Sequence, residues 1–201
     1  MKKAIKPIIY ICIILLISGL RTFVCSWEIS IYDTEIESDG YGSFGQMSGN
    51  AYIEQRFFCE LDGLEGVLLQ PVTFNRTENG TLTYQLIDAE TQETVTEGTA
   101  DTTGWTDAEF TKISFPRIDQ SGEKEFILRI QADNTPSEQG IAFYTTEKQD
   151  NTSFNINGEE TDSCLVMKTV HRTFNVEEFI VFAGLLLYIV LFIKLLYKFL
   201  R

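Results

Sequence analysis

The sequence predicts an all-β domain, an antiparallel β-sandwich of jelly-roll-like form, with one apolar helix at each end of the chain. Three observations predict it. Apolar residues recur at strand spacing in short runs, as in TLTYQLI, where Leu82, Tyr84 and Leu86 share one face. Turn dipeptides separate these runs. Long uninterrupted apolar segments occur only near the two ends, and no stretch between them keeps a 3.6-residue period.

Residues 1–27 form the first segment, in which three lysines precede a 13-residue apolar run, Ile8 to Leu20. That length and polarity suit a signal peptide, cleaved after Val24-Cys25-Ser26 and before Trp27. They also suit a retained signal anchor from Ile8 to Trp27, in which Arg21 reaches outward and Trp27 lies in the membrane interface. The residues leave both readings open.

Residues 179–201 form the last segment, a predicted transmembrane helix with a short basic tail. Phe179 to Tyr197 contains one charge, Lys194, and its 19 residues span most of a hydrocarbon core of ~30 Å. Acids in the 173–178 stalk precede the helix, and Lys198 and Arg201 end it. The positive-inside rule therefore predicts a cell-membrane protein with its domain on the extracytoplasmic side. Both termini are then cytoplasmic if the N-terminal segment is retained.

Residues 28–172 make up the predicted sandwich. Its turns include Asp62-Gly63, Asn79-Gly80 and Asn157-Gly158, and the polar stretch Gln149 to Thr161 reads as a loose connection. The expected strands are Glu28–Asp33, Ala51–Cys59, Gly66–Asn75, Thr81–Asp88, Thr94–Asp101, Glu109–Phe115, Lys124–Ala132, Ile141–Thr146 and Ser163–Thr169.

The charge distribution excludes nucleic acid as a partner. All 29 acidic residues lie between Trp27 and Glu178, where only nine lysines and arginines accompany them, giving that segment a net charge of −20. A surface this acidic repels phosphate backbones.

The sequence favours a protein that is not an enzyme. It contains no G-x-S-x-G, H-E-x-x-H or Gly-rich phosphate loop. Its one histidine, His171, stands beside Arg172 near the C-terminal helix and is expected to be exposed in the stalk. No catalytic residue is therefore expected.

Several short motifs between Gln55 and Thr146 carry a resemblance to a bacterial family. They are the Gln55-Arg56-Phe57 strand, a strand ending in Thr73-x-x-Arg76, Gly80-Thr81-Leu82 before a Leu-x-Asp strand, and the Ser121-Gly122-Glu123-Lys124 turn. The pattern resembles extracytoplasmic jelly-roll, galactose-binding-like domains associated with membrane glycosyltransferases and cell-surface polysaccharide assembly. This resemblance implies a carbohydrate-facing sandwich that serves such a pathway.

Aromatic and polar loop residues are the candidates for glycan binding. Trp105 lies in a polar Gly/Thr/Asp loop, although it also suits a side chain folded over an open end of the sandwich. Tyr84, Phe126 and Phe143 alternate on strands and are expected in the core. The other glycan candidates are Tyr41 and Phe44 in a Gly-rich loop, and Asn75 and Arg76 at a strand end.

Two further features have open interpretations. Asp101, Asp107 and Glu109 offer three carboxylates in one loop, the oxygen ligands that calcium prefers, but the sequence favours a solvated acidic loop over a calcium site. Cys59 and Cys164 are candidates for a disulfide, and Cys59 also suits a small core position.

Together these observations predict a membrane-anchored, non-catalytic module that binds glycan or assists bacterial envelope polysaccharide assembly. Its expected partners are the membrane, a cell-surface glycan and a membrane glycosyltransferase or other polytopic protein. The alternative is a structural subunit that docks on a polytopic partner through its transmembrane helix.

Overall fold

The computed structural model describes residues 2–24, 26–74, 80–133, 135–136, 139–174 and 176–200. The chain divides into two compact units: one is the β domain Trp27–His171, and the other combines Met1–Ser26 with Arg172–Arg201.

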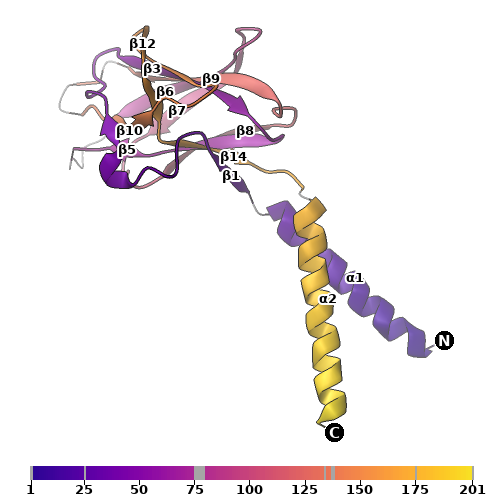
Figure 1. Ribbon diagram of the computed structural model, residues 1–201. Helices are drawn as coiled ribbons and strands as arrows, with labels where there is room; N and C mark the ends of the chain where they lie inside the picture. The colour runs from indigo at the N-terminus through magenta and orange to yellow at the C-terminus, as the bar shows by residue number, and fades with distance from the viewer. Residues whose placement is uncertain are drawn as a thin grey trace. The chain divides into compact units, whose positions relative to one another are not determined.

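The β domain is an antiparallel sandwich, as the sequence predicts, and its first layer is a six-stranded sheet (Figure 1). Neighbouring strands in this sheet run antiparallel throughout. In spatial order the strands are β12 (Glu159–Thr161), β11 (Ser153–Ile156), β3 (Tyr52–Cys59), β9 (Lys124–Ala132), β6 (Thr81–Asp88) and β7 (Thr94–Asp101).

The second layer consists of two smaller sheets that share two long runs of chain. One run holds β4 and β5, separated by Gln70, and the other holds β13 and β14, separated by Val166. The first small sheet has the order β1 (Trp27–Ser30), β14 (Met167–His171), β4 (Leu64–Leu69), β8 (Thr111–Ile118). The second has the order β13 (Ser163–Leu165), β10 (Ala142–Glu147), β2 (Gly42–Ser43), with β5 (Pro71–Val72) also paired to β10.

The core lies between these layers, and strand alternation explains its composition. Along β9, Phe126, Leu128 and Ile130 are buried while the residues between them are partly exposed. Tyr84 and Phe143 are buried in the same core, which confirms the sequence prediction for these aromatic residues.

Gln55 ties the two layers together from inside the core. Its side chain is fully buried on β3; Nε2 donates to the carbonyls of Arg56 (2.9 Å) and Ser153 (3.3 Å). Its Oε1 accepts the backbone N–H of Leu165 on β13 at 2.9 Å. The glutamine of the Gln-x-Phe motif therefore stabilises the fold, because a buried amide must have its polar groups paired.

The polar stretch predicted as a loose connection is instead a β-hairpin. Strands β11 and β12 lie within it and extend the six-stranded sheet beyond β3. Asn157 and Gly158 join them with positive φ angles of 52° and 88°, the conformation of a two-residue hairpin turn. The prediction was wrong because these strands are short and polar, although the Asn-Gly turn itself was recognised.

His171 is not exposed in a stalk: it is fully buried at the end of β14. Its Nδ1 lies 3.4 Å from the carbonyl oxygen of Asp62, and its Nε2 lies 2.9 Å from Thr169 Oγ1. The neutral ring satisfies both neighbours by donating from Nδ1 and accepting at Nε2. Burial lowers the pKa of His171, against smaller opposing contributions from the Asp62 and Leu61 carbonyls and from the charges of Glu60 and Asp62.

The candidate disulfide does not form, because Cys59 and Cys164 are both free, buried thiols, and Cys59 takes the alternative role of a small core residue. Leu165, beside Cys164, contacts Gln55 rather than Cys59. Four residues of strand separate Gln55 from Cys59, or ~13 Å at ~3.3 Å per residue, which is too far for a disulfide. The thiols bond instead to the carbonyls of Leu61 and Ile31, and burial raises the pKa of each to about 11.

The second unit contains helices α1 (Lys2–Val24) and α2 (Val176–Phe199). Among the described residues, α2 is the one helix long and apolar enough to cross a membrane, and α1 contributes a shorter apolar stretch, Tyr10–Thr22. The two helices contact each other: the Arg21 guanidinium lies 3.4 Å from Glu178 Oε1 and 4.3 Å from the centre of the Phe182 ring.

We predict that Gln55→Leu destabilises the sandwich by about 1–3 kcal/mol, because it leaves the Leu165 N–H and the Ser153 carbonyl unpaired in the core. Urea unfolding of the detergent-solubilised chain, followed by the fluorescence of Trp27 and Trp105, measures this change. The matched control is Gln85→Leu, since the Gln85 side chain donates to Glu97 on the exposed side of β6. Equal stability of Gln55→Leu and the control contradicts the cross-layer role.

We further predict that the free energy of unfolding falls as the pH drops from about 7 to about 5. The folded state holds His171 neutral with a lowered pKa. The unfolded state therefore binds the proton first, below its ordinary pKa of about 6.5. Because His171 is the only histidine, His171→Gln removes this slope. A slope that persists in His171→Gln, measured by urea unfolding at several pH values, would falsify the assignment.

Candidate functional site

Two of the predicted glycan-binding aromatics belong to the core. The Trp105 ring packs 6.3 Å from Phe143, and the Phe44 ring packs 5.5 Å from Phe154, both centre to centre. Both side chains are partly buried against the main core cluster. Trp105 therefore packs on the core, in line with the alternative role considered for it, and both side chains remain partly exposed.

The remaining predicted glycan residues have different outcomes. Asn75 and Arg76 lie outside the described residues. Tyr41 lies in a group of half-buried rings with Tyr32, Phe110 and Tyr144, which we call the aromatic cluster.

The carboxylates predicted to bind calcium do not converge. Asp101 accepts the backbone N–H of Thr103 at 2.8 Å, and its pKa is lowered by hydrogen bonds from Thr103. Asp107 instead accepts the backbone N–H of Thr73 at 2.7 Å and the hydroxyl of Tyr144 at 3.2 Å. Within the described part of the chain, no three acidic, histidine or cysteine side chains group as metal ligands. These carboxylates, Glu109 included, thus form no calcium site in the structure.

The aromatic cluster assembles rings from four separate stretches of chain. Tyr32 follows β1, Tyr41 lies between the short 3-10 helix Ser38–Gly40 and β2, Phe110 directly precedes β8, and Tyr144 lies within β10. The ring of Tyr32 stands nearly perpendicular to that of Tyr41 (89°, 6.1 Å) and 6.3 Å from that of Phe110. Tyr41 and Tyr144 lie 6.2 Å apart at 56°.

Backbone pairing explains how Tyr41 reaches Tyr144. Gly42 pairs with Thr145, and a Cβ atom at position 42 would lie 3.2 Å from Thr145 Oγ1. The small residue lets β2 approach β10 closely, which brings Tyr41, one residue earlier, beside the Tyr144 ring.

Polar and charged groups border the rings. Asp107 accepts the Tyr144 hydroxyl, while the Lys168 ammonium lies 4.6 Å from the centre of the Phe110 ring. Lys168 also forms an ion pair with Glu28, with 3.1 Å between nitrogen and oxygen.

Tyr41 and Tyr144 keep their protons at neutral pH. Burial raises the pKa of Tyr41, with a further contribution from Tyr32, and burial together with the Asp107 carboxylate raises the pKa of Tyr144. Their hydroxyl groups can therefore donate as well as accept hydrogen bonds. The arrangement provides apolar ring surface with a few oriented polar groups, the usual composition of a small-ligand site.

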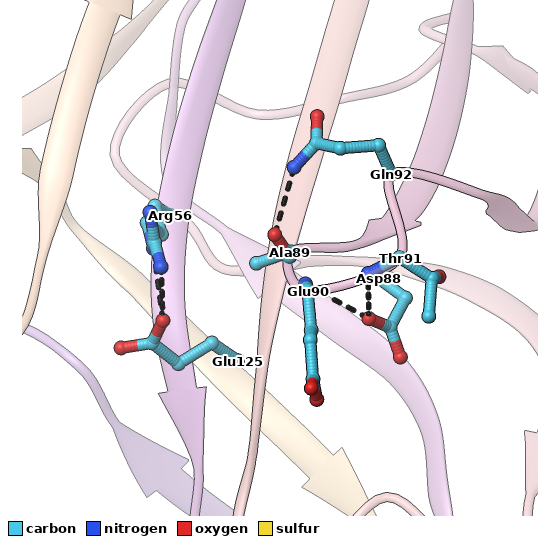
Figure 2. A network of polar contacts seen from close by, with 7 residues as sticks. All are labelled: Arg56, Asp88, Ala89, Glu90, Thr91, Gln92 and Glu125. Carbon is cyan, nitrogen blue, oxygen red and sulfur yellow. Dashed lines mark hydrogen bonds and ion pairs between the residues drawn. The ribbon is translucent and has the colours of Figure 1, made fainter.

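A second, polar region lies at one end of the six-stranded sheet (Figure 2). Here Arg56 pairs with Glu125, and Asp88 accepts the backbone N–H groups of Glu90 (2.9 Å) and Thr91 (3.0 Å). Gln92, at a positive φ of 60°, donates to the Ala89 carbonyl at 2.7 Å. A depression of about 360 Å³ adjoins these residues, lined by Arg56, Asp88, Glu90, Glu123, Lys124 and Glu125.

The contacts drawn in Figure 2 join residues of this region to one another. Asp88 caps the turn between β6 and β7, and its hydrogen bonds with that turn lower its pKa. The lining also contains no aromatic ring. This region is accounted for by turn structure and a surface ion pair, so the aromatic cluster is the stronger candidate site.

Sequence reasoning found only part of the cluster. It selected Tyr41 as a glycan residue and Asp107 as a calcium ligand, and the structure links both through Tyr144. It missed Tyr32, Phe110 and Tyr144. The spacing of acids around them, as in Asp107-Ala-Glu109-Phe110, was read as a metal signal instead of the border of an aromatic surface.

Comparisons with known proteins give no family. No protein-family model matches the chain, and no curated protein matches it. Among solved structures, the chain is similar to that of the cysteine protease and lectin-like domains of Cwp84, a surface layer associated protein of Clostridium difficile. The TM-score is 0.36 at 10% identity, over 68% of this chain and only 37% of that one. A likeness this distant does not indicate what the present chain binds.

Proposed function

We propose that this chain is a membrane-anchored saccharide-binding protein whose sandwich binds glycan at the aromatic cluster. The observation that supports it is the convergence of four half-buried rings from separate chain segments beside a carboxylate and an ammonium group. Packing of the core does not require charged groups beside half-buried rings. The rings lie where the two small sheets meet.

The chemistry of the cluster suits a sugar ring. A pyranose has an apolar face of C–H groups, which packs on an aromatic ring, and a rim of hydroxyls, which need hydrogen-bond partners. Tyr41 and Tyr144 supply ring surface and protonated hydroxyls. Asp107 supplies a carboxylate acceptor that the Thr73 backbone already holds in place.

The helices supply the membrane attachment in this proposal. Helix α2 is long and apolar enough to cross a bilayer, and the basic residues after it favour a cytoplasmic C-terminus with the sandwich outside. The proposed role is a non-catalytic accessory one in bacterial envelope polysaccharide assembly, as the family resemblance of the sequence implies.

Contacts between the helices favour the retained form of the N-terminal segment. Ser18 and Thr22 are buried, and Gly19 leaves Phe179 only 3.9 Å from the site of a Cβ atom. Such small residues let helices approach closely in a membrane. The Arg21–Glu178 pair adds a charge interaction between the same two helices.

We predict that Tyr41→Ala weakens saccharide binding at least tenfold, about 1.4 kcal/mol, because it removes one ring face of the cluster. Isothermal titration of the solubilised chain with oligosaccharides measures this. The matched control is Tyr52→Ala on β3, a half-exposed tyrosine of the other layer. Equal losses in the two variants contradict the assignment of the cluster.

If no oligosaccharide binds the wild-type chain, the saccharide-binding proposal fails. The alternative of a structural subunit then predicts that replacing α2 with an unrelated apolar helix disrupts assembly with a membrane partner, whereas Tyr41→Ala has no effect.

We predict that the membrane-bound protein keeps residues 1–26. An N-terminal and a C-terminal epitope tag should remain on one polypeptide after expression. Gly19→Cys with Phe179→Cys should cross-link through a short bifunctional thiol reagent, because the Phe179 ring reaches within 3.9 Å of the site of a Gly19 Cβ atom. The control pair is Gly19→Cys with Gly184→Cys, since a Cβ atom at Gly184 meets nothing within 4 Å. Loss of the N-terminal tag from the membrane-bound chain contradicts retention.

A further inference from the structure

We infer that the saccharide bound at the aromatic cluster carries free amino groups, as in a polymer of hexosamine that is not acetylated. This inference rests on the proposed function and specifies its ligand class.

The cluster already holds one ammonium group. The Nζ atom of Lys168 lies 4.6 Å from the centre of the Phe110 ring, within the range in which a cation is attracted to a ring face. Lys168 lies on β14 and Phe110 before β8, so the contact joins separate parts of the sheet. The charge of Lys168 is also balanced by Glu28 at 3.1 Å, which reduces its repulsion of a second cation.

The other rings of the cluster pack on one another at steep angles. Tyr32 and Tyr41 are perpendicular at 6.1 Å, and Tyr41 and Tyr144 are inclined by 56° at 6.2 Å. In such edge-to-face packing the positive edge of one ring meets the electron-rich face of the next, and the ring faces that stay exposed can attract a cation. A neutral sugar uses such rings only as apolar surface, whereas an ammonium group also gains from their charge distribution.

One acid contacts the cluster, and three more stand within two residues of a cluster residue in the sequence. Asp33 follows Tyr32, Asp39 precedes Tyr41 by two residues, Glu109 precedes Phe110, and Asp107 bonds to Tyr144; all four acids are exposed or half-exposed. The segment from Trp27 to Glu178 carries a net charge of −20, which attracts cations and repels anionic polymers. The same field that excludes nucleic acid therefore favours an amino sugar over an acidic or phosphorylated glycan.

A matched pair of ligands tests this inference. Isothermal titration of the full chain in neutral detergent compares a glucosamine hexamer with the N-acetylglucosamine hexamer of the same length. We expect the free amine to bind at least about threefold more tightly, the gain of one exposed cation–π contact. We also expect that advantage to shrink between about 50 mM and about 300 mM salt, because salt screens surface charges.

Two variants separate the cluster from the general surface charge. Asp107→Asn keeps the size of the side chain and removes its charge, so it should weaken binding of the amine hexamer more than that of the acetylated one. Tyr41→Ala should weaken both. Amine binding that is unchanged in Tyr41→Ala reflects attraction to the acidic surface as a whole and overturns the inference.

The outcomes also distinguish the inference from the function on which it rests. Equal or tighter binding of the acetylated hexamer, or preferential binding of an acidic polymer such as hyaluronate, overturns the amino-sugar inference and leaves saccharide binding intact. Binding of no sugar overturns both. Competition of a lysine-rich peptide for Tyr41-dependent sites, with no sugar bound, identifies the cluster as a peptide site and likewise overturns both.

Discussion

The aromatic cluster depends on the way the backbone of Tyr144 is held from both sides. Its N–H donates to the carbonyl of Gln70, and its carbonyl accepts the N–H of Val166, each at 2.9 Å. Gln70 and Val166 are the residues at which the two long runs of chain pass from one small sheet to the other. Because both runs break at the residues that bond to Tyr144, its ring is fixed at the junction of the small sheets, where Tyr41 and Asp107 can reach it.

The same architecture separates the polar and aromatic residues that stabilise the fold from those that we propose bind ligand. Gln55, His171, Trp105 and Phe44 turn inward or pack on the core, where their partners belong to the sandwich itself. The cluster rings are buried to a degree similar to Trp105 and Phe44, but they pack on one another, and their polar neighbours are charged. In our proposal, the acidic residues near the cluster add to the attraction that its aromatic faces have for cations.

Much of the fold follows from local sequence patterns, and the site does not. Alternation places Thr81–Asp88 and Lys124–Ala132 at the ends observed in the structure, because each of these strands buries one face. Thr94–Asp101 also has the predicted ends, although its residues alternate only between exposed and partly exposed. The hairpin around Asn157 carries too few apolar residues for that signal. The burial of His171 and the convergence of Tyr32, Tyr41, Phe110 and Tyr144 arise from long-range pairing. Strands distant in sequence become neighbours, and residue spacing carries no information about that.

The most direct test of the account is to observe the tyrosine rings themselves as ligand is added. The chain has eight tyrosines, and fluorotyrosine labelling gives each a separate fluorine resonance that single Tyr→Phe variants assign. Titration with the glucosamine hexamer should shift the resonances of Tyr32, Tyr41 and Tyr144 and leave those of Tyr52 and Tyr84 in place. Shifts confined to Tyr52, on the other layer, or spread evenly over all eight rings would contradict a binding site at the aromatic cluster.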